Sequence, residues 1–166
     1  MSHKPDVLEL LGDDHREAER LFDAYEATRD PARGRALGEQ LVDWTLQHVT
    51  AVERHLHPAV ARSVPGGEAI VAQWPRRRAA LETAVRDMGA ADPEGPEFDR
   101  AVRALMEWIL GHIADEEARV FPPLREALTH RERFDLGSGA EQARRRALDP
   151  GTGVLERVRA WLTSGA

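Results

Sequence analysis

Apolar residues recur at helical spacing along almost the whole chain, and clusters of proline and glycine divide this pattern into four long segments. Runs of β-branched residues with a period of two, which indicate strands, are missing. Four helices of about 20 to 30 residues joined by short links predict an all-α protein, folded as an up-down-up-down four-helix bundle. We expect helices over residues 5–27, 31–62, 68–88 and 97–128, with Pro75 kinking or restarting the third.

The last part of the chain predicts shorter helices added to this bundle. Thr129 and Glu132 have the spacing of a capping box, and residues 154–162 form an amphipathic stretch that contains Trp161. We therefore assign residues 1–128 to the bundle and residues 129–166 to a C-terminal helical appendage packed on it. The apolar face around Trp161 either packs on its own chain, which we favour, or forms the contact of a homodimer.

The length and the absence of cysteine limit the kind of protein and of site. A chain of 166 residues suits a single domain. Without cysteine, disulfides, thiolate zinc sites and iron–sulfur clusters are excluded, so any metal binds through nitrogen and oxygen. The N-terminus lacks the pattern of a secretion signal, and no apolar run reaches about twenty residues. We expect a cytoplasmic protein with no membrane partner.

The charge distribution argues against nucleic acid as a partner. The net charge is -6 and most arginines are scattered, whereas nucleic-acid binding relies on clustered basic residues. We interpret the two arginine triplets, at residues 76–78 and 144–146, as solvated helix faces. A Gly-rich phosphate loop is missing, and no Ser/His/Asp arrangement suggests a nucleophile. A conventional kinase or hydrolase is therefore excluded, and the sequence leaves open whether the protein is an enzyme.

One segment of the chain occurs twice, beginning at His48 and again, in the fourth predicted helix, at His112. Histidine followed four residues later by glutamate places an imidazole and a carboxylate on the same face of a helix, an arrangement that binds first-row metals. The second copy has this spacing, with Glu116. In the first copy the fourth residue is Val52, and the nearest acid, Glu53, lies one position further round the helix.

Three histidines are predicted to point into the bundle. His15, His48 and His112 lie on three different helices, each in register with an apolar stripe. Burying several imidazoles together with a carboxylate costs free energy unless they are paired or bind a metal. The candidate metal ligands are therefore His15, His48, His112 and Glu116, with Glu53 as a further oxygen donor.

These residues resemble the hemerythrin-like HHE cation-binding family over residues 6–128. The resemblance implies a four-helix bundle that holds two irons bridged by carboxylates. It implies that His15 is the ligand from the first helix, His48 the histidine of the second, and His112 and Glu116 the histidine and bridging carboxylate of the fourth. The most similar segments are Asp14-His15 with Leu21-Phe22, His48 to Pro58, Asp92 to Phe98, and His112 to Pro122.

The chain departs from the family pattern in two places. Val52 replaces the carboxylate of the second helix, although Glu53 can stand in because some hemerythrins use a five-residue spacing. The third helix has no histidine and reads Trp74-Pro-Arg-Arg-Arg78, where an inward arginine would repel a metal or pair with Glu116. His55 and Glu19 are alternative metal ligands. Asp115 and Glu53 are candidates to orient a ligating imidazole by hydrogen bonding. His57 and Glu117 are expected to face away from the site.

Two functions follow from this pattern. The first is a non-heme metal protein with an altered site of one or two irons, or zinc, that binds or senses a small diatomic or peroxide ligand such as dioxygen, nitric oxide or peroxide. The second is a degenerate, metal-free bundle that acts as an interaction or regulatory module, with an arginine neutralising Glu116. A ferritin-like oxidase fits less well because its paired ligands have the acid before the histidine.

Overall fold

The computed structural model describes residues 5–149 and 151–164, and every regular element within these ranges is a helix. The all-α prediction is confirmed. None of the described helices is long and apolar enough to cross a membrane. The elements are α1 (Val7–Ala27), α2 (Pro31–Ala51), η1 (Val52–Leu56), α3 (His57–Ser63), α4 (Gly67–Val71), α5 (Trp74–Ala90), α6 (Pro96–Asp115), η2 (Glu116–Val120), α7 (Phe121–Ala127), α8 (His130–Arg146) and α9 (Val154–Ser164).

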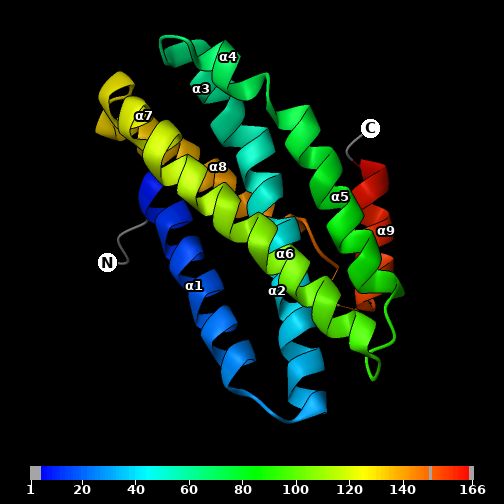
Figure 1. Ribbon diagram of the computed structural model, residues 1–166. Helices are drawn as coiled ribbons and strands as arrows, with labels where there is room; N and C mark the ends of the chain where they lie inside the picture. The colour runs from blue at the N-terminus through cyan, green and yellow to red at the C-terminus, as the bar shows by residue number, and fades with distance from the viewer. Residues whose placement is uncertain (1–4, 150, 165–166) are drawn as a thin grey trace.

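Four long helical segments lie side by side and form the body of the molecule (Figure 1). They are α1, the run from α2 to α3, the run from α4 to α5, and the run from α6 to α7. The third segment is interrupted as expected, because α4 ends at Val71 and Pro75 lies in the first turn of α5. The two remaining helices cover the body: α8 packs against α1, α2 and η1, and α9 packs against α5 and α2.

A π-helical turn interrupts both the second and the fourth segment. In η1, the amide of His57 donates to the carbonyl of Val52, five residues back instead of four. Pro58 follows, and its ring would clash with the carbonyl four residues earlier in an uninterrupted α-helix. A wider π-turn relieves such a clash. The fourth segment repeats the arrangement in η2, where the amide of Phe121 donates to the carbonyl of Glu116 before Pro122.

The apolar interior is divided into two clusters, with a polar layer between them. The start of α1 contributes to one cluster and its second half to the other, and Asp14 and His15 lie in between. The apolar residues are Val7, Leu8, Leu10 and Leu11 in the first cluster and Ala18, Leu21 and Phe22 in the second. The second and fourth segments contribute to this layer in the same way. Its buried members are Asp14, His15, His48, His112 and Glu116.

The last helix packs on its own chain through Trp161. Its side chain is only 4% exposed, and its indole nitrogen donates to Thr50 Oγ1 over 3.2 Å. The guanidinium of Arg78 lies 3.6 Å from the centre of the indole ring, as in a cation–π contact. Within the chain, Trp161 therefore contacts α2 and α5. The division of the chain at residue 128 stays a prediction.

Helix α8 approaches the start of α1 closely at Gly137. A Cβ on this residue would lie 2.6 Å from the carbonyl oxygen of Pro5 and 2.9 Å from the amide of Val7. Both are backbone atoms, so no side chain can rotate to make room. We expect Gly137→Ala to destabilise the protein by about 1–3 kcal/mol, the usual cost of overpacking, measured by urea denaturation.

The matched control for this substitution is Gly111→Ala. Gly111 is also helical but exposed, and nothing lies within 4 Å of a Cβ built on it. Alanine should be neutral there or stabilising by up to about 1 kcal/mol, because it favours the helix over glycine. Equal effects of the two substitutions would contradict the close packing of α8.

Candidate metal centre

Three buried side chains from three helical segments bring their ligand atoms together in the polar layer. Potential metal-binding atoms of His15, His48 and Glu116 all lie within 4.8 Å of one another. Glu116 Oε2 lies 3.0 Å from His15 Nε2 and 3.2 Å from His48 Nε2. Ligands at right angles around an ion, with bonds of about 2.1 Å, lie about 3 Å apart. The spacing of the three atoms therefore fits a common metal ion.

The second oxygen of Glu116 faces the third histidine. His112 Nε2 lies 3.2 Å from Glu116 Oε1, but the two atoms do not meet in hydrogen-bond geometry. Among the described residues, Glu116 Oε1 and both ring nitrogens of His112 are buried without a hydrogen-bond partner. Such orphaned atoms are costly unless something else satisfies them. His112 Nε2 and Glu116 Oε1 approach each other without forming a hydrogen bond, as ligands on either side of a metal ion do. The residues present therefore suit a bound metal ion.

Carboxylates hold the outer nitrogens of His15 and His48. Asp14 Oδ2 lies 3.2 Å from His48 Nδ1, and Glu117 Oε1 lies 2.8 Å from His15 Nδ1. A carboxylate at Nδ1 keeps a proton on that nitrogen and directs Nε2 toward a metal. Asp14 is itself held from α8, because Arg144 donates to its Oδ1 over 2.5 Å. Helix α8 therefore contributes to the orientation of His48.

Aromatic rings pack against the histidines of the polar layer. Trp44 stacks on His48 with ring centres 4.7 Å apart, and Trp108 stacks on His112 at 4.9 Å. Trp44 is also tied to α1, since its indole nitrogen donates to the carbonyl of Asp14 over 2.9 Å. These contacts fix the planes of the imidazoles and restrict the access of water.

Burial and charge divide the histidines into charged and neutral groups. Burial alone would lower the pKa of His48, but the carboxylates of Glu116 and Asp14 raise it to about 9. Burial favours the neutral form of Glu116, yet His112 and His48 hold its pKa well below the ordinary value. Burial lowers the pKa of His112, and that of His57 to about 4. At neutral pH, His48 and Glu116 form a buried ion pair, whereas His112 and His57 are neutral.

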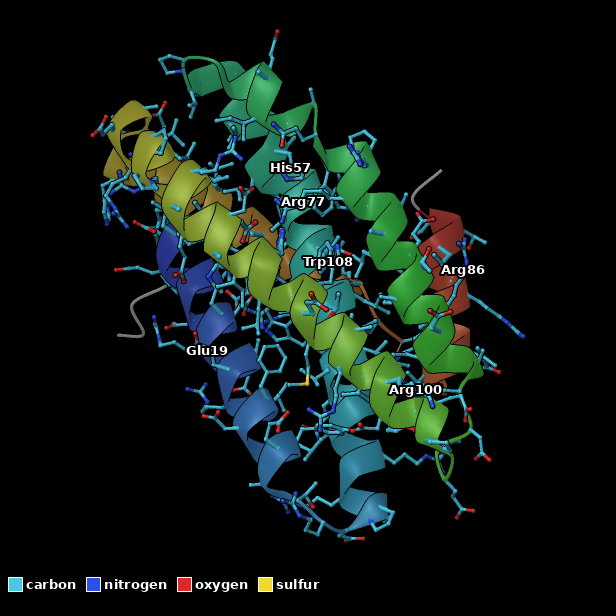
Figure 2. All side chains as sticks on the ribbon, viewed as in Figure 1. Glu19, His57, Arg77, Arg86, Arg100 and Trp108 are labelled. Carbon is cyan, nitrogen blue, oxygen red and sulfur yellow. The ribbon has the colours of Figure 1, made fainter. Side chains whose placement is uncertain are left out.

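A small cavity opens beside His112 and Glu116. Its volume is about 30 Å³, and its walls include His57, Trp74 and Arg77. In Figure 2, His57, Arg77 and Trp108 lie in a row between α6 and α5. A cavity needs about 10–15 Å³ to hold one water molecule, so this one accommodates one or two.

Three of the five predicted ligands, His15, His48 and Glu116, converge within 4.8 Å of one another. His112 lies beside them, 3.2 Å from the second oxygen of Glu116, and the fifth predicted ligand lies elsewhere. Glu53 lies in η1, where its Oε1 accepts hydrogen bonds from Trp74 Nε1 over 2.7 Å and from Arg78 over 2.5 Å. It does not belong to the group of converging ligand atoms in the described residues. Val52, the residue that replaces the expected carboxylate, is completely buried in an apolar cluster.

The alternative donors also lie away from the centre. Glu19 is exposed on the outside of α1 (Figure 2). His55 faces α8, since a Cβ on Gly139 would lie 2.6 Å from its ring. Asp115, expected to orient an imidazole, instead accepts hydrogen bonds from Arg77 over 2.6 Å and from Arg119 over 3.2 Å.

Two residues expected to face away contribute to the centre, and the π-turns explain one of them. Nine residues along an ideal α-helix turn about 900°, which would put His57 opposite His48. The π-turn accommodates one more residue in the same arc, so residues beyond it are turned back by about 100°. His57 therefore reaches the cavity. Glu117 contacts His15 across the helix interface, and only the packing of α1 against η2 could reveal this.

Asp14→Asn is expected to weaken metal binding about 10- to 100-fold, the usual effect of removing a carboxylate that orients a ligating histidine. The amide cannot hold the His48 imidazole as the carboxylate does, and it loses the ion pair with Arg144. Competition with a chromophoric chelator measures the affinity. Asp13→Asn, at an exposed position on the same helix, is the control. Equal affinities of the two variants would show that Asp14 does not orient His48.

Comparison with known proteins agrees with this geometry. A sequence model described as Hemerythrin HHE cation binding domain matches residues 6–124. The solved structure of a hemerythrin HHE cation binding domain-containing protein from Mycobacterium kansasii superposes with a TM-score of 0.74 at 19% identity, covering 93% of this chain and 99% of that one. This second likeness shows the fold alone.

A curated DNA nickase from Nostoc sp. is 24% identical over 123 residues. The match covers 74% of this chain but 34% of the nickase, so the chain spans about a third of the length of that relative.

Proposed function

The chain belongs to the hemerythrin HHE cation-binding family, and we propose that it is a non-heme iron protein that binds or senses a small molecule such as dioxygen, nitric oxide or peroxide. The observation that carries the proposal is the buried cluster of three histidines around Glu116, next to a cavity of about 30 Å³. His15, His48, His112 and Glu116 would hold the metal. Iron bound there would supply an open coordination position and redox reactivity.

The residues around the cluster prepare it for a small ligand. The cavity has room for one or two water-sized groups, which favours a diatomic molecule or a peroxide over an organic substrate. Trp74 and Trp108 pack around His112 and exclude bulk water. Arg77 and Arg119 line the same cavity, and their positive charges are partly neutralised by Asp115. An anionic form of the ligand would be stabilised by these guanidinium groups.

The two oxygens of Glu116 support a site for one or two ions. Oε2 faces His15 and His48, and Oε1 faces His112. Each oxygen would therefore be available to a separate metal ion. Three imidazoles and one carboxylate also suit zinc. Metal analysis of protein grown in defined medium distinguishes bound iron from bound zinc.

We further propose a cytoplasmic protein without a nucleic-acid partner. Four of the six arginines in the two triplets pair with carboxylates of the same chain, three of them at partly buried positions and Arg145 on the exposed surface. The net charge of -6 also disfavours binding to phosphates. The relevant arginines are Arg77, Arg78, Arg144 and Arg145.

The experiment that tests the proposal is anaerobic loading with ferrous iron, followed by titration with nitric oxide and by exposure to air or peroxide. We expect retained iron and an absorption change that saturates in proportion to the iron bound. The same treatment of His48→Ala should give neither. Iron that is retained without any response to the three ligands would point to a structural metal. Failure to retain iron would favour the metal-free interaction or regulatory module.

A further inference from the structure

Three of the four tryptophans pack against histidines of the polar layer. Trp44 stacks on His48, whereas Trp74 and Trp108 both contact His112, with ring centres 5.7 and 4.9 Å away. The two indoles at His112 also contact each other, at 6.3 Å. An indole ring gives up a single electron more readily than an imidazole or a benzene ring. Oxidisable side chains therefore lie in direct contact with the proposed metal centre.

Trp74 differs from the other indoles in its hydrogen-bond partner. Its Nε1 donates to Oε1 of Glu53 over 2.7 Å. The indole nitrogens of Trp44 and Trp108 donate to backbone carbonyls, and that of Trp161 donates to a threonine hydroxyl. An indole that loses an electron becomes a cation and a strong acid. A carboxylate stabilises this cation by its charge and can take its proton, and a neutral acceptor does neither.

Trp74 also lies where a small ligand would bind. It lines the cavity of about 30 Å³ together with His112 and Glu116, whereas Trp108 does not. An electron that leaves Trp74 can reach the proposed metal centre through the imidazole of His112. The indole is partly exposed, so a reductant in solution has access to it. The ring thus joins the cavity, the metal centre and the solvent.

A single ferrous ion cannot supply all the electrons that the reduction of peroxide consumes. Among the described residues, His15, His48 and Glu116 bring their ligand atoms together, a set that fits one ion. The reduction of hydrogen peroxide to two water molecules takes two electrons and two protons, and a ferrous ion that becomes ferric gives up one electron. If only that electron were supplied, cleavage of the O–O bond would release a hydroxyl radical. The second electron has to come from a neighbouring group.

We propose that Trp74 is a one-electron donor that acts together with one ferrous ion to reduce hydrogen peroxide to water. The ion supplies one electron, the indole supplies the other, and two protons come from the solvent. The indole N–H proton passes to Glu53, which leaves a neutral tryptophanyl radical. A one-electron reductant of the ascorbate class then reduces the radical and the ferric ion, and the proton returns from Glu53. The proposal rests on the function proposed above and specifies peroxide as its substrate.

The test is rapid mixing of the ferrous-loaded full chain with hydrogen peroxide, followed by freeze-quenching and electron paramagnetic resonance. We expect an organic radical in the parent protein whose signal narrows when tryptophan is ring-deuterated. This labelling distinguishes it from a radical on Tyr25, the single tyrosine of the chain. Trp74→Phe should lose the radical and release hydroxyl radical to a spin trap, while it retains iron at the level of the parent protein.

Glu53→Gln tests the path of the proton. The amide oxygen can still accept a hydrogen bond from the indole, but it cannot take the proton. The tryptophanyl radical of this variant should therefore keep its N–H proton, which adds a hyperfine coupling that exchanges in deuterated water. A purely structural role of Glu53 would leave the spectrum of the radical unchanged and would overturn this part of the proposal.

Trp161→Phe is the matched control. Trp161 lies in α9, where its indole nitrogen donates to Thr50, and phenylalanine keeps an aromatic ring over Arg78. This variant should give the same radical as the parent protein. An equal radical signal in Trp74→Phe would overturn the assignment of Trp74. Oxidation of the iron by peroxide without an organic radical in the parent protein would also overturn it, and would leave the proposed function standing. A parent protein that retains no iron would overturn both.

Discussion

Glu116→Gln is expected to abolish metal retention, because this one carboxylate faces all three histidines of the centre. An amide is a weak, neutral ligand and cannot bridge two ions as a carboxylate does. The loss of affinity should exceed the roughly 10- to 100-fold that follows removal of a group hydrogen-bonded to a ligand. Elemental analysis after loading and desalting measures it. Any metal that remains in stoichiometric amount would show that Glu116 is not a ligand.

This substitution also removes one partner of a buried ion pair. Glu116 opposes the effect of burial on His48 and contributes to raising its pKa to about 9. Breaking a buried pair by removing one partner costs about 3–5 kcal/mol, so folding has to be verified by circular dichroism and thermal unfolding. Glu107→Gln, at an exposed position in α6 of the same helical segment, controls for the loss of a negative charge. It should retain metal at the level of the parent protein.

Removal of metal with a chelator is expected to lower the melting temperature by about 5–11 °C. A ligand that binds only the folded state stabilises it by about 2.7 kcal/mol at a free concentration of 100 times Kd. For a protein of this size, each kcal/mol shifts the melting temperature by about 2–4 °C. The contribution arises because the converging ligand atoms exist only in the folded chain. Differential scanning calorimetry with and without ferrous iron measures the shift.

His48→Ala provides the comparison for this measurement. The variant should unfold at the same temperature with and without metal, since its loss leaves Glu116 Oε2 with His15 alone. A parent protein that is also insensitive to metal would favour the interaction or regulatory module. A variant that keeps the full shift would show that the stabilising metal binds elsewhere.

The helical architecture could be predicted from the sequence because it depends on local periodicity. The first helix was expected from residue 5 to 27 and is observed from Val7 to Ala27, after a capping box at Asp6. The restart at Pro75 followed from the missing amide of proline. The π-turns were not predicted. Prolines at equivalent places in both copies of the repeated segment were the signal, since each one conflicts with the carbonyl four residues before it.

The candidate metal ligands at regular helical spacing could also be predicted from the sequence. His15, His48, His112 and Glu116 align with the apolar stripes of their helices, and stripes that pack together must bring such residues into one layer. Glu53 was expected to be a metal ligand only if its side chain could reach the site from a position one residue further round the helix than Val52. Contacts with Trp74 and Arg78, from another segment, direct it away from the layer.

The sequence by itself determined that the chain is helical and that His15, His48 and His112 lie on inner faces, because both follow from the 3.6-residue period of the backbone. Only the tertiary structure decided which oxygen of Glu116 faces which histidine, that Asp14 and Arg144 orient His48, and that His57 reaches the cavity. These features depend on the rotation of one helix relative to another and on the extra residue in a π-turn. A rotation of about 100° moves a side chain from one face to another, and local spacing contains no information about the neighbouring helix.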